Sequence, residues 1–475
     1  MQFQLRAAFD KVADSQSRVH RDLEPARLGE GRDQKMSVSE GRGDEKIGAA
    51  ADARRIHRQL LYMVLAALAI RLIVMAFLYP EQLDPKLDHW KFGYETGRVA
   101  RAIVRGQGIS NPLYTDTGPS AFMTPIYTYV LAGVFKIFGV YTKTSALVIL
   151  SLNALTSALN CIPIFFIARQ KFGDRVGIWS GWAWAFFPYA IYFPVERIWS
   201  TWLSTLLLSL LFLIVLYLED SSSYKAWVGY GLLWGLAGMT EPIVLSVLPF
   251  LSLWACYRLH RQGKRWFWPA TASALAFFLV VTPWFVRNYR LFHQFIPFRD
   301  TMGLELIIGN SGDSFHWRPA EIGPWHNPAD WAEFQRAGEL NYMADKKRQA
   351  LEFIKGHRAW FARQTVRRIV YVWTGFWSFN PRYLEEEPLD PYNVIFCTGV
   401  TILTLLGLWR AFRDNFDAAM PYALVLFSFP LIYYFTHPEV YYRRQIDPMF
   451  VILAVYAVLS RRHAAPASSQ QEVAP

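Results

Sequence analysis

The sequence predicts an all-α polytopic membrane protein with about ten transmembrane helices, outer juxtamembrane helices and a helical segment on the outer face. Its 475 residues are 53% hydrophobic and only 18% charged, which is too apolar for an ordinary soluble protein. The apolar residues gather in runs of about 17–25, long enough to cross a hydrocarbon core of roughly 30 Å as helices. Between the runs there is no period-two alternation of the kind that a transmembrane β-barrel requires.

The net charge, the cysteines and the histidines argue against nucleic-acid binding and against a metal site. A net charge of +11 is typical of a membrane protein whose cytoplasmic loops are rich in Lys and Arg. Because no zinc-finger or aromatic-basic RNA motif is present, nucleic acid is not an expected partner. The three cysteines lie in apolar runs and are expected to be buried thiols rather than a disulfide or metal set. The histidines of the outer side lack ligand spacing, so no metal or other cofactor is expected; they are His316, His326, His357 and His437.

The two ends of the chain are polar. Residues 1–55 are charged and rich in Gly, which predicts a disordered cytoplasmic tail without the apolar stretch of a signal peptide. Met36 is an alternative start to Met1. The expected division is 1–55 tail, 56–285 transmembrane module with a first outer loop at 81–142, 286–392 outer helical segment, 393–462 C-terminal transmembrane helices and 463–475 second tail.

The first expected span, Gln59–Tyr79, contains a charged residue, Arg71. A bare charge at the middle of a transmembrane helix costs roughly 2.5–3.5 kcal/mol on insertion scales. Arg71 should therefore face the interior of the bundle or a water-filled cavity. Two roles fit equally well: a contact to an anionic ligand, or a structural pair with a buried carboxylate.

The short apolar segment Met123–Gly139 decides the topology. The next apolar run ends in a basic turn from Arg169 to Arg175. If Met123–Gly139 lies half-embedded at the outer surface, this turn falls in the cytoplasm, as the positive-inside rule requires. The expected spans after the first are then 145–168, 177–192, 199–218, 226–240, 242–257, 267–285, 393–409, 418–434 and the helix around Val451.

This topology places both termini in the cytoplasm and gathers many polar residues at the outer face. They are Asp88, Glu95, Glu196, Arg197, Glu241, Arg287, Asn288, Glu305, Glu439, Tyr441, Arg443 and Arg444. Because nucleotide sugars and ATP are absent on that side, any group transfer there needs an activated donor that arrives in the membrane. A sugar linked to polyprenyl phosphate meets that need.

The polar stretch 88–108 follows the first span and contains two acids, Asp88 and Glu95. Seven residues correspond to about two helical turns, so both carboxylates can lie on one face of a helix. Arg98, Arg101 and Arg105 follow directly. On its own this pattern also fits a solvated amphipathic helix in which Glu95 pairs with Arg98 at i,i+3.

Several short motifs occur along the chain in a specific order. They are Glu95-Thr-Gly-Arg-Val-Ala100, Thr124-Pro125-Ile-Tyr127, Ala168-Arg-Gln-Lys-Phe-Gly173, Gly235-Leu-Ala-Gly-Met-Thr-Glu-Pro242, Thr282-Pro-Trp284 with Arg287-Asn288, and Tyr442-Arg443 with Ile446-Asp-Pro448. Their order and spacing over residues 59–460 resemble the GT-C glycosyltransferases of the family 39 type. These are bacterial relatives of protein O-mannosyltransferases and of lipid A aminoarabinose transferases.

The resemblance implies a GT-C-like fold in the inner (plasma) membrane of a bacterium. It implies an enzyme that moves a hexosyl or pentosyl group from a polyprenyl-phosphate donor to a hydroxyl or phosphate on a lipid, glycan or protein. The family's catalytic carboxylate matches Glu95, although family members usually carry Asp there, and Asp88 is the second candidate. A single base suffices for direct displacement with inversion, because the leaving lipid phosphate needs cations rather than a general acid.

The resemblance also locates a donor site that departs from the family. Aminoarabinose transferases carry a Lys where this chain has Thr124, and a second family acid falls near Ser200-Thr201. The predicted phosphate-binding residues are Arg287, Arg444, Arg443 and Arg71, since Arg contacts phosphate oxygens bidentately. Snorkelling beside a helix end is the alternative role for such arginines. Glu196, Asn288 and Tyr441 are predicted secondary or acceptor-side residues.

Two other classes of function stay open from the sequence. A transporter or flippase of a lipid-linked saccharide would suit a charged residue inside a span, such as Arg71. Such a protein often shows two related halves, and the long outer segment has no counterpart in the first half of this chain. An enzyme-like protein that has lost catalysis would suit the departures at Thr124 and Ser200.

Overall fold

The computed structural model describes residues 34–82, 92–311, 322–325, 327–386, 389–439 and 441–460. It divides into two compact units, Met1–Arg58 and Gln59–Pro475. Helix α2 (Gln34–Gln82) contributes to both units. Residues 34–55, which the sequence places in a disordered tail, belong to this helix.

The second unit is built from helices, and the described residues contain no β-strand beyond an isolated bridge between Ser110 and Pro119. Seven helical segments of the described ranges are long and apolar enough to cross a membrane. They are Arg54–Leu78 of α2, Lys143–Phe172 (α5, Lys143–Leu159, and α6, Cys161–Phe172), Thr201–Leu218 (α9), Pro242–Arg261 (η1, Pro242–Ser246, and α11, Leu248–Arg261), Phe267–Phe292 (α12), Asp390–Asp414 (α18) and Phe416–Phe435 (α19, Phe416–Ser428, and α20, Leu431–Phe435). The predicted all-α polytopic fold is confirmed.

The other expected spans coincide with shorter helices. They are α7 (Asp174–Ala185) with α8 (Pro188–Glu196), α10 (Tyr224–Thr240) and α21 (Asp447–Leu459). Each packs against a spanning segment: α7 against α6, α10 along α12, and α21 along α18. The short segment that decides the topology forms α4 (Pro125–Phe138), an apolar helix below spanning length.

Two glycines let these helices approach closely. A Cβ on Gly231 of α10 would lie 1.9 Å from the carbonyl oxygen of Ser273 in α12, and one on Gly407 of α18 would lie 2.0 Å from that of Leu453 in α21. Small residues permit such approaches between membrane helices, where packing rather than water exclusion holds helices together.

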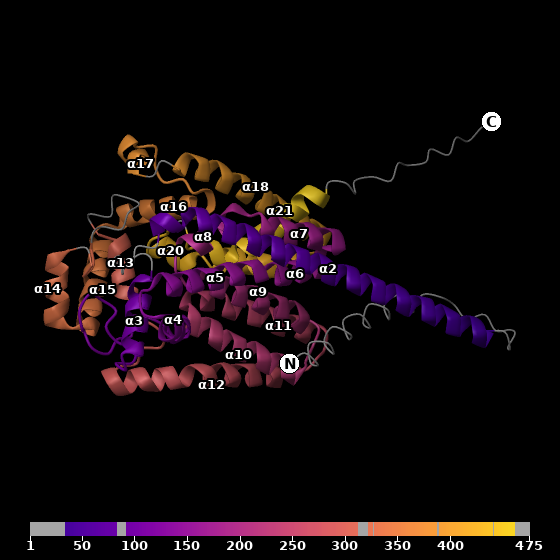
Figure 1. Cartoon of the computed structure of the whole chain (residues 1–475), viewed down its shortest axis with the longest axis horizontal. Coiled ribbons are helices and arrows are strands. Elements are labelled where there is room, and N and C mark those ends of the chain that lie inside the picture. Colours follow the sequence, from indigo (N-terminus) through magenta and orange to yellow (C-terminus); the bar gives the residue numbers. More distant parts are fainter. Residues whose placement is uncertain are drawn as a thin grey trace. The chain divides into compact units, whose positions relative to one another are not determined.

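The remaining helices gather at one end of the second unit. They are α3 (Tyr94–Val104), α13 (Met302–Gly309), α14 (Pro328–Ala337), α15 (Glu339–Gly356), α16 (Arg358–Thr374), α17 (Pro381–Glu386) and the short η2 (Arg444–Ile446). Figure 1 shows α3, α13, α14 and α15 together there, and we call this end of the bundle the α3 end. α3 packs on α4, and α13 on α15. Lys346 joins α15 to α14 through Asp330 at 2.6 Å and Glu333 at 2.9 Å.

Candidate active site

Glu95 lies in the first turn of α3, directly after a left-handed turn. Gly93 has φ of 86° and precedes the helix, a conformation that glycine adopts without strain. At Gly97, one turn further on, a Cβ would lie 1.9 Å from the carbonyl of Phe92, so the start of α3 tolerates no larger residue there. The local sequence therefore fixes where the Glu95 carboxylate stands.

Opposing effects act on the pKa of the Glu95 carboxylate. The side chain is buried, and burial raises its pKa. A backbone N–H of the helix start and the charges of Arg98 and Arg299 oppose this rise, whereas Glu305 adds to it. The amino end of a helix also favours a negative charge. The result is a carboxylate with a raised pKa that still faces cations, as a general base requires.

A second carboxylate, Glu241, reaches the α3 end from the residue after α10. The hydroxyl of Ser200 donates to Glu241 Oε2 at 2.6 Å, and Arg299 Nη1 lies 3.7 Å from Oε1. Thr124 Oγ1 donates to the carbonyl of Thr240 at 3.0 Å. The two positions where the sequence departs from the family pattern, Thr124 and Ser200, thus both contact the end of α10.

Three aromatic side chains form a cluster that begins at Tyr94, the residue before Glu95. Tyr94 packs edge-on against Trp199 at 5.7 Å between ring centroids, and Trp199 lies 5.6 Å from Tyr441. The guanidinium of Arg197 covers the Tyr441 ring at 4.9 Å and its Nε bonds Glu196 at 2.7 Å. Burial raises the pKa of Tyr441, so this phenol stays protonated. The predicted secondary residues Glu196 and Tyr441 therefore lie together in one cluster.

Arg287 and Asn288 hold the first outer loop. Arg287 donates to the carbonyls of Ile109 and Ser120, each at 2.7 Å, and to Asn288 Oδ1 at 2.9 Å. Asn288 is fully buried and donates to the carbonyl of Ile296 at 2.9 Å. Both side chains are thus occupied by the protein's own acceptors. Their roles in phosphate and acceptor binding stay predictions.

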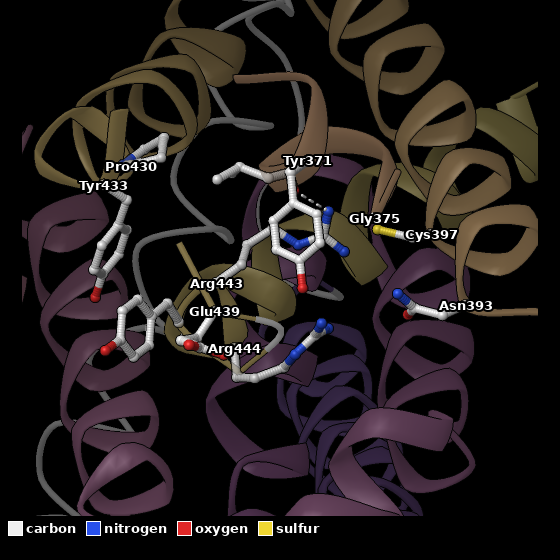
Figure 2. Close-up of a pocket in the computed structure, with 11 residues that line it drawn as sticks. Tyr371, Gly375, Asn393, Cys397, Pro430, Tyr433, Glu439, Arg443 and Arg444 are labelled. Carbon is white, nitrogen blue, oxygen red and sulfur yellow. Dashed lines mark hydrogen bonds between the residues drawn. The ribbon is translucent and has the colours of Figure 1, made fainter. Parts of the chain in front are cut away.

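Arg443 and Arg444 share one carboxylate at the start of α21. Asp447 accepts from Arg443 Nε at 3.2 Å and from Arg444 Nη1 at 2.7 Å. Arg443 also donates to the carbonyl of Val372 at 2.8 Å, and Arg444 lies 3.5 Å over the Tyr189 ring. Figure 2 shows both guanidinium groups in the wall of a cavity of about 20 Å³, room for roughly one water molecule.

Arg71 is fully buried between three helices. Its guanidinium donates to Ser157 Oγ in α5 at 3.0 Å, to the carbonyl of Ala67 at 2.7 Å and to that of Ala185 in α7 at 3.1 Å. It faces the bundle interior, as expected for a charge inside a span. Its bonded partners are carbonyls and a hydroxyl, so the structural role that the structure supports differs from the carboxylate pair expected from the sequence.

Other predicted positions lie elsewhere. Asp88, His316 and His326 fall outside the described residues. His437 is buried, with Nδ1 3.6 Å from Glu305 Oε2. Within the described ranges no group of three or more His, Cys, Asp and Glu side chains is arranged to hold a metal ion.

Sequence reasoning missed two residues of this site, Glu241 and Arg299. Glu241 was placed at the outer face without a role, and Arg299 was not singled out. The spacing of the sequence contains no signal for their pairing, because they lie on different elements and meet only in the folded chain.

The fold and the site define a polytopic helical membrane protein with a buried carboxylate at one end of the bundle. Residues 122–285 match the family model described as dolichyl-phosphate-mannose-protein mannosyltransferase. The predicted resemblance to GT-C glycosyltransferases is thus confirmed over this part of the chain. A comparison with curated protein sequences finds no match.

Solved structures with similarity to this chain include two membrane transferases. The oligosaccharyltransferase of Archaeoglobus fulgidus, in complex with Zn and sulfate, is 14% identical with a TM-score of 0.49, covering 85% of this chain and 49% of that chain. ArnT from Cupriavidus metallidurans, bound to undecaprenyl phosphate, is 14% identical with a TM-score of 0.36, covering 83% and 77%. The chain therefore spans about half the length of the archaeal enzyme.

Proposed function

We propose that this chain is a membrane glycosyltransferase with Glu95 as its catalytic base. It moves a hexosyl or pentosyl group from a polyprenyl-phosphate donor to a hydroxyl or phosphate acceptor on a lipid, glycan or protein. The observation that carries the proposal is the Glu95 carboxylate itself: buried at the start of α3, with a raised pKa and the charges of Arg98 and Arg299 nearby. The family match over residues 122–285 supports the reaction class.

The chemistry needs one base and no acid. Glu95 takes the proton of the acceptor hydroxyl while the acceptor oxygen attacks the anomeric carbon. The bond from that carbon to the phosphate oxygen breaks, and the lipid phosphate leaves with both electrons. Attack opposite the leaving group inverts the anomeric carbon, whereas retention would need a carboxylate nucleophile. For a phosphate acceptor, which carries little or no proton, Glu95 would orient rather than deprotonate.

The basic turns support a site on the non-cytoplasmic face. Lys171 pairs with Glu219 at 2.5 Å, and Gln262 donates to the carbonyl of Glu219 at 3.0 Å, so the turns after α6 and α11 meet at the end of α9. Ser200, beside Glu241, precedes the other end of α9, about 27 Å away at 1.5 Å per residue. Because Lys and Arg mark cytoplasmic loops, both termini would lie in the cytoplasm and the site at the opposite face of a bacterial inner membrane.

A release assay tests this function. Purified protein receives an undecaprenyl-phosphate-linked sugar, and the freed lipid phosphate is measured for the wild type, for Glu95→Gln and for Glu352→Gln, a control whose side chain is 62% exposed. We expect release by the wild type and the control and its loss in Glu95→Gln. Unchanged release by Glu95→Gln would refute the mechanism, and Asp88→Asn would then test the alternative base. Movement of the intact lipid-linked sugar across a bilayer without release would identify a flippase instead.

A further inference from the structure

Two charged groups of the α3 end, Glu241 and Arg299, take no proton in the base mechanism. Glu241 follows the last residue of α10, and Arg299 lies in the loop between α12 and α13. Arg299 Nη1 stands 3.7 Å from Glu241 Oε1, and Ser200 Oγ donates to Glu241 Oε2 at 2.6 Å. Three segments distant in sequence thus meet around one carboxylate.

Glu241 stands between two helices, as the residue after α10 and the N-cap residue of η1. The carboxyl end of α10 repels its charge and the amino end of η1 attracts it. Its side chain makes no capping hydrogen bond to η1. The carboxylate is only 16% exposed and instead contacts Ser200 and Arg299. Because Glu241 does not cap η1, these two contacts point to a function of the carboxylate other than ending or starting a helix.

Arg299 differs from the arginines that the sequence singles out. Arg287 is occupied by two loop carbonyls and an amide oxygen, and Arg443 by Asp447 and the carbonyl of Val372. In the described part of the chain, Arg299 makes one hydrogen bond, from Nε to the carbonyl of Phe122 at 2.8 Å. That bond fixes the side chain at Nε and leaves its terminal nitrogens with the 3.7 Å contact to Glu241.

The side chain of Arg299 is 24% exposed, so a ligand has access to it. The charge of Arg299 acts on Glu95, where it counteracts the effect of burial on the carboxylate. A guanidinium whose charge reaches the base suits the anionic leaving group of the same reaction. Its planar pair of donors matches two oxygens of a phosphate.

We propose that Arg299 binds the phosphate of the lipid-linked donor and that Glu241, held by Ser200, positions the Arg299 guanidinium. The inference rests on the proposed function. During transfer, the bond between the anomeric carbon and the phosphate oxygen breaks, and Arg299 neutralises the charge that the leaving phosphate gains. The acceptor proton goes to Glu95, and Glu241 exchanges none. Arg299 is then a catalytic residue and Glu241 a positioning residue.

Binding of undecaprenyl phosphate tests Arg299 without requiring transfer. Full-length protein in nanodiscs is titrated with this lipid as wild type, Arg299→Gln, Arg299→Lys and Arg348→Gln, whose side chain on α15 is 59% exposed. We expect Kd to rise at least tenfold in Arg299→Gln, less in Arg299→Lys, and not at all in Arg348→Gln. Wild-type affinity in Arg299→Gln would overturn the proposal. An absence of binding by the wild type would overturn the donor class and this inference together.

A double variant that moves the carboxylate from position 241 to position 200 tests the positioning role of Glu241. Because Ser200 Oγ lies 2.6 Å from Glu241 Oε2, an Asp at position 200 would place a carboxylate oxygen close to the same point. We expect Glu241→Gln to raise Kd for undecaprenyl phosphate and the donor KM more than it lowers kcat, and Ser200→Asp with Glu241→Gln to restore both. A double variant that binds no better than Glu241→Gln, while melting at the wild-type temperature, would overturn the positioning role. The proposed function would survive that result if lipid phosphate is still released.

Discussion

A pair of half-buried carboxyl groups, Asp300 and Glu339, makes the stability of the α3 end depend on pH. Desolvation raises the pKa of Asp300 from 3.8 to about 6 and that of Glu339 well above 4.5, and the charge of Asp300 adds to the rise at Glu339. Glu339 also accepts from the backbone N–H of Ala121 at 2.7 Å. One proton shared between the groups satisfies both, whereas two negative charges would repel. Ionisation of the pair should therefore loosen the contact between α15 and the loop before α4.

The direction and size of this pH dependence follow from the difference in proton binding between the folded and the unfolded chain. Since the folded protein holds these protons more tightly than the unfolded chain, the contribution of this pair to stability is largest below about pH 4 and falls as pH rises through 6. The rise in the pKa of Asp300 corresponds to roughly 3 kcal/mol. Asp300→Asn removes this penalty and keeps a donor for Glu339. We expect the variant to unfold at a higher temperature than the wild type at pH 8 and at a similar temperature at pH 4.

Thermal unfolding in detergent between pH 4 and 9 measures this effect. Asp330→Asn is a matched control, because Asp330 is buried but pairs with Lys346 at 2.6 Å. Its loss leaves the Lys346 ammonium with Glu333 alone, at 2.9 Å, and should lower the unfolding temperature at pH 8. The reasoning is refuted if Asp300→Asn is no more stable than the wild type at pH 8, or if its advantage is the same at pH 4.

Three further outcomes are expected. Glu95→Gln should lower kcat about 10²–10⁴-fold, the usual contribution of a general base, without a matching loss of lipid-phosphate binding; an equal loss of binding would instead indicate a structural role. Gly407→Ala should destabilise the protein by about 1–3 kcal/mol in thermal unfolding, because its Cβ would meet the facing helix, whereas Gly399→Ala, with open space on the same helix, should not. Arg287→Gln should speed hydrogen exchange of the loop that Arg287 holds; unchanged exchange together with weaker lipid-phosphate binding would favour its predicted ligand role.

The fold could be predicted from the sequence because short stretches of the chain determine where each helix forms. The length of an apolar run decides whether a helix can cross the membrane, as for Phe267–Phe292, without reference to any other part of the chain. The start of α3 is equally local, since Gly93 and Gly97 fix it within a few residues. The break between α7 and α8 is local as well, because Pro188 has no backbone N–H and stands at the first position of α8. The expected single span 177–192 passed over this signal.

The roles of the arginines could not be predicted, because they depend on acceptors far away in the chain. Arg287 reads as an interfacial cation, yet its acceptors at Ser120 and Ile109 are 167 and 178 residues away. For Arg71 the sequence suggests either a contact to an anionic ligand or an ion pair with a carboxylate, but backbone carbonyls and the hydroxyl of Ser157 are its bonded partners. The sequence shows that an arginine needs partners, and only the folded chain shows whether the protein already supplies them.

The charged contacts around the first outer loop have a common consequence. Arg287 holds the carbonyl of Ser120, Glu339 holds the N–H of Ala121, and Arg299 holds the carbonyl of Phe122. Ser120, Ala121 and Phe122 lie just before Thr124 and α4, and the hydroxyl of Thr124 donates to the carbonyl of Thr240 at the end of α10. Three consecutive residues of the loop between α3 and α4 are thus each held by a charged side chain. A transfer that depends on a sugar held between a base and a phosphate-binding cation needs such fixed geometry, because small displacements of reacting groups slow a reaction strongly. In the proposed transfer, Arg287, Glu339 and Arg299 would serve the chemistry by holding this loop in place.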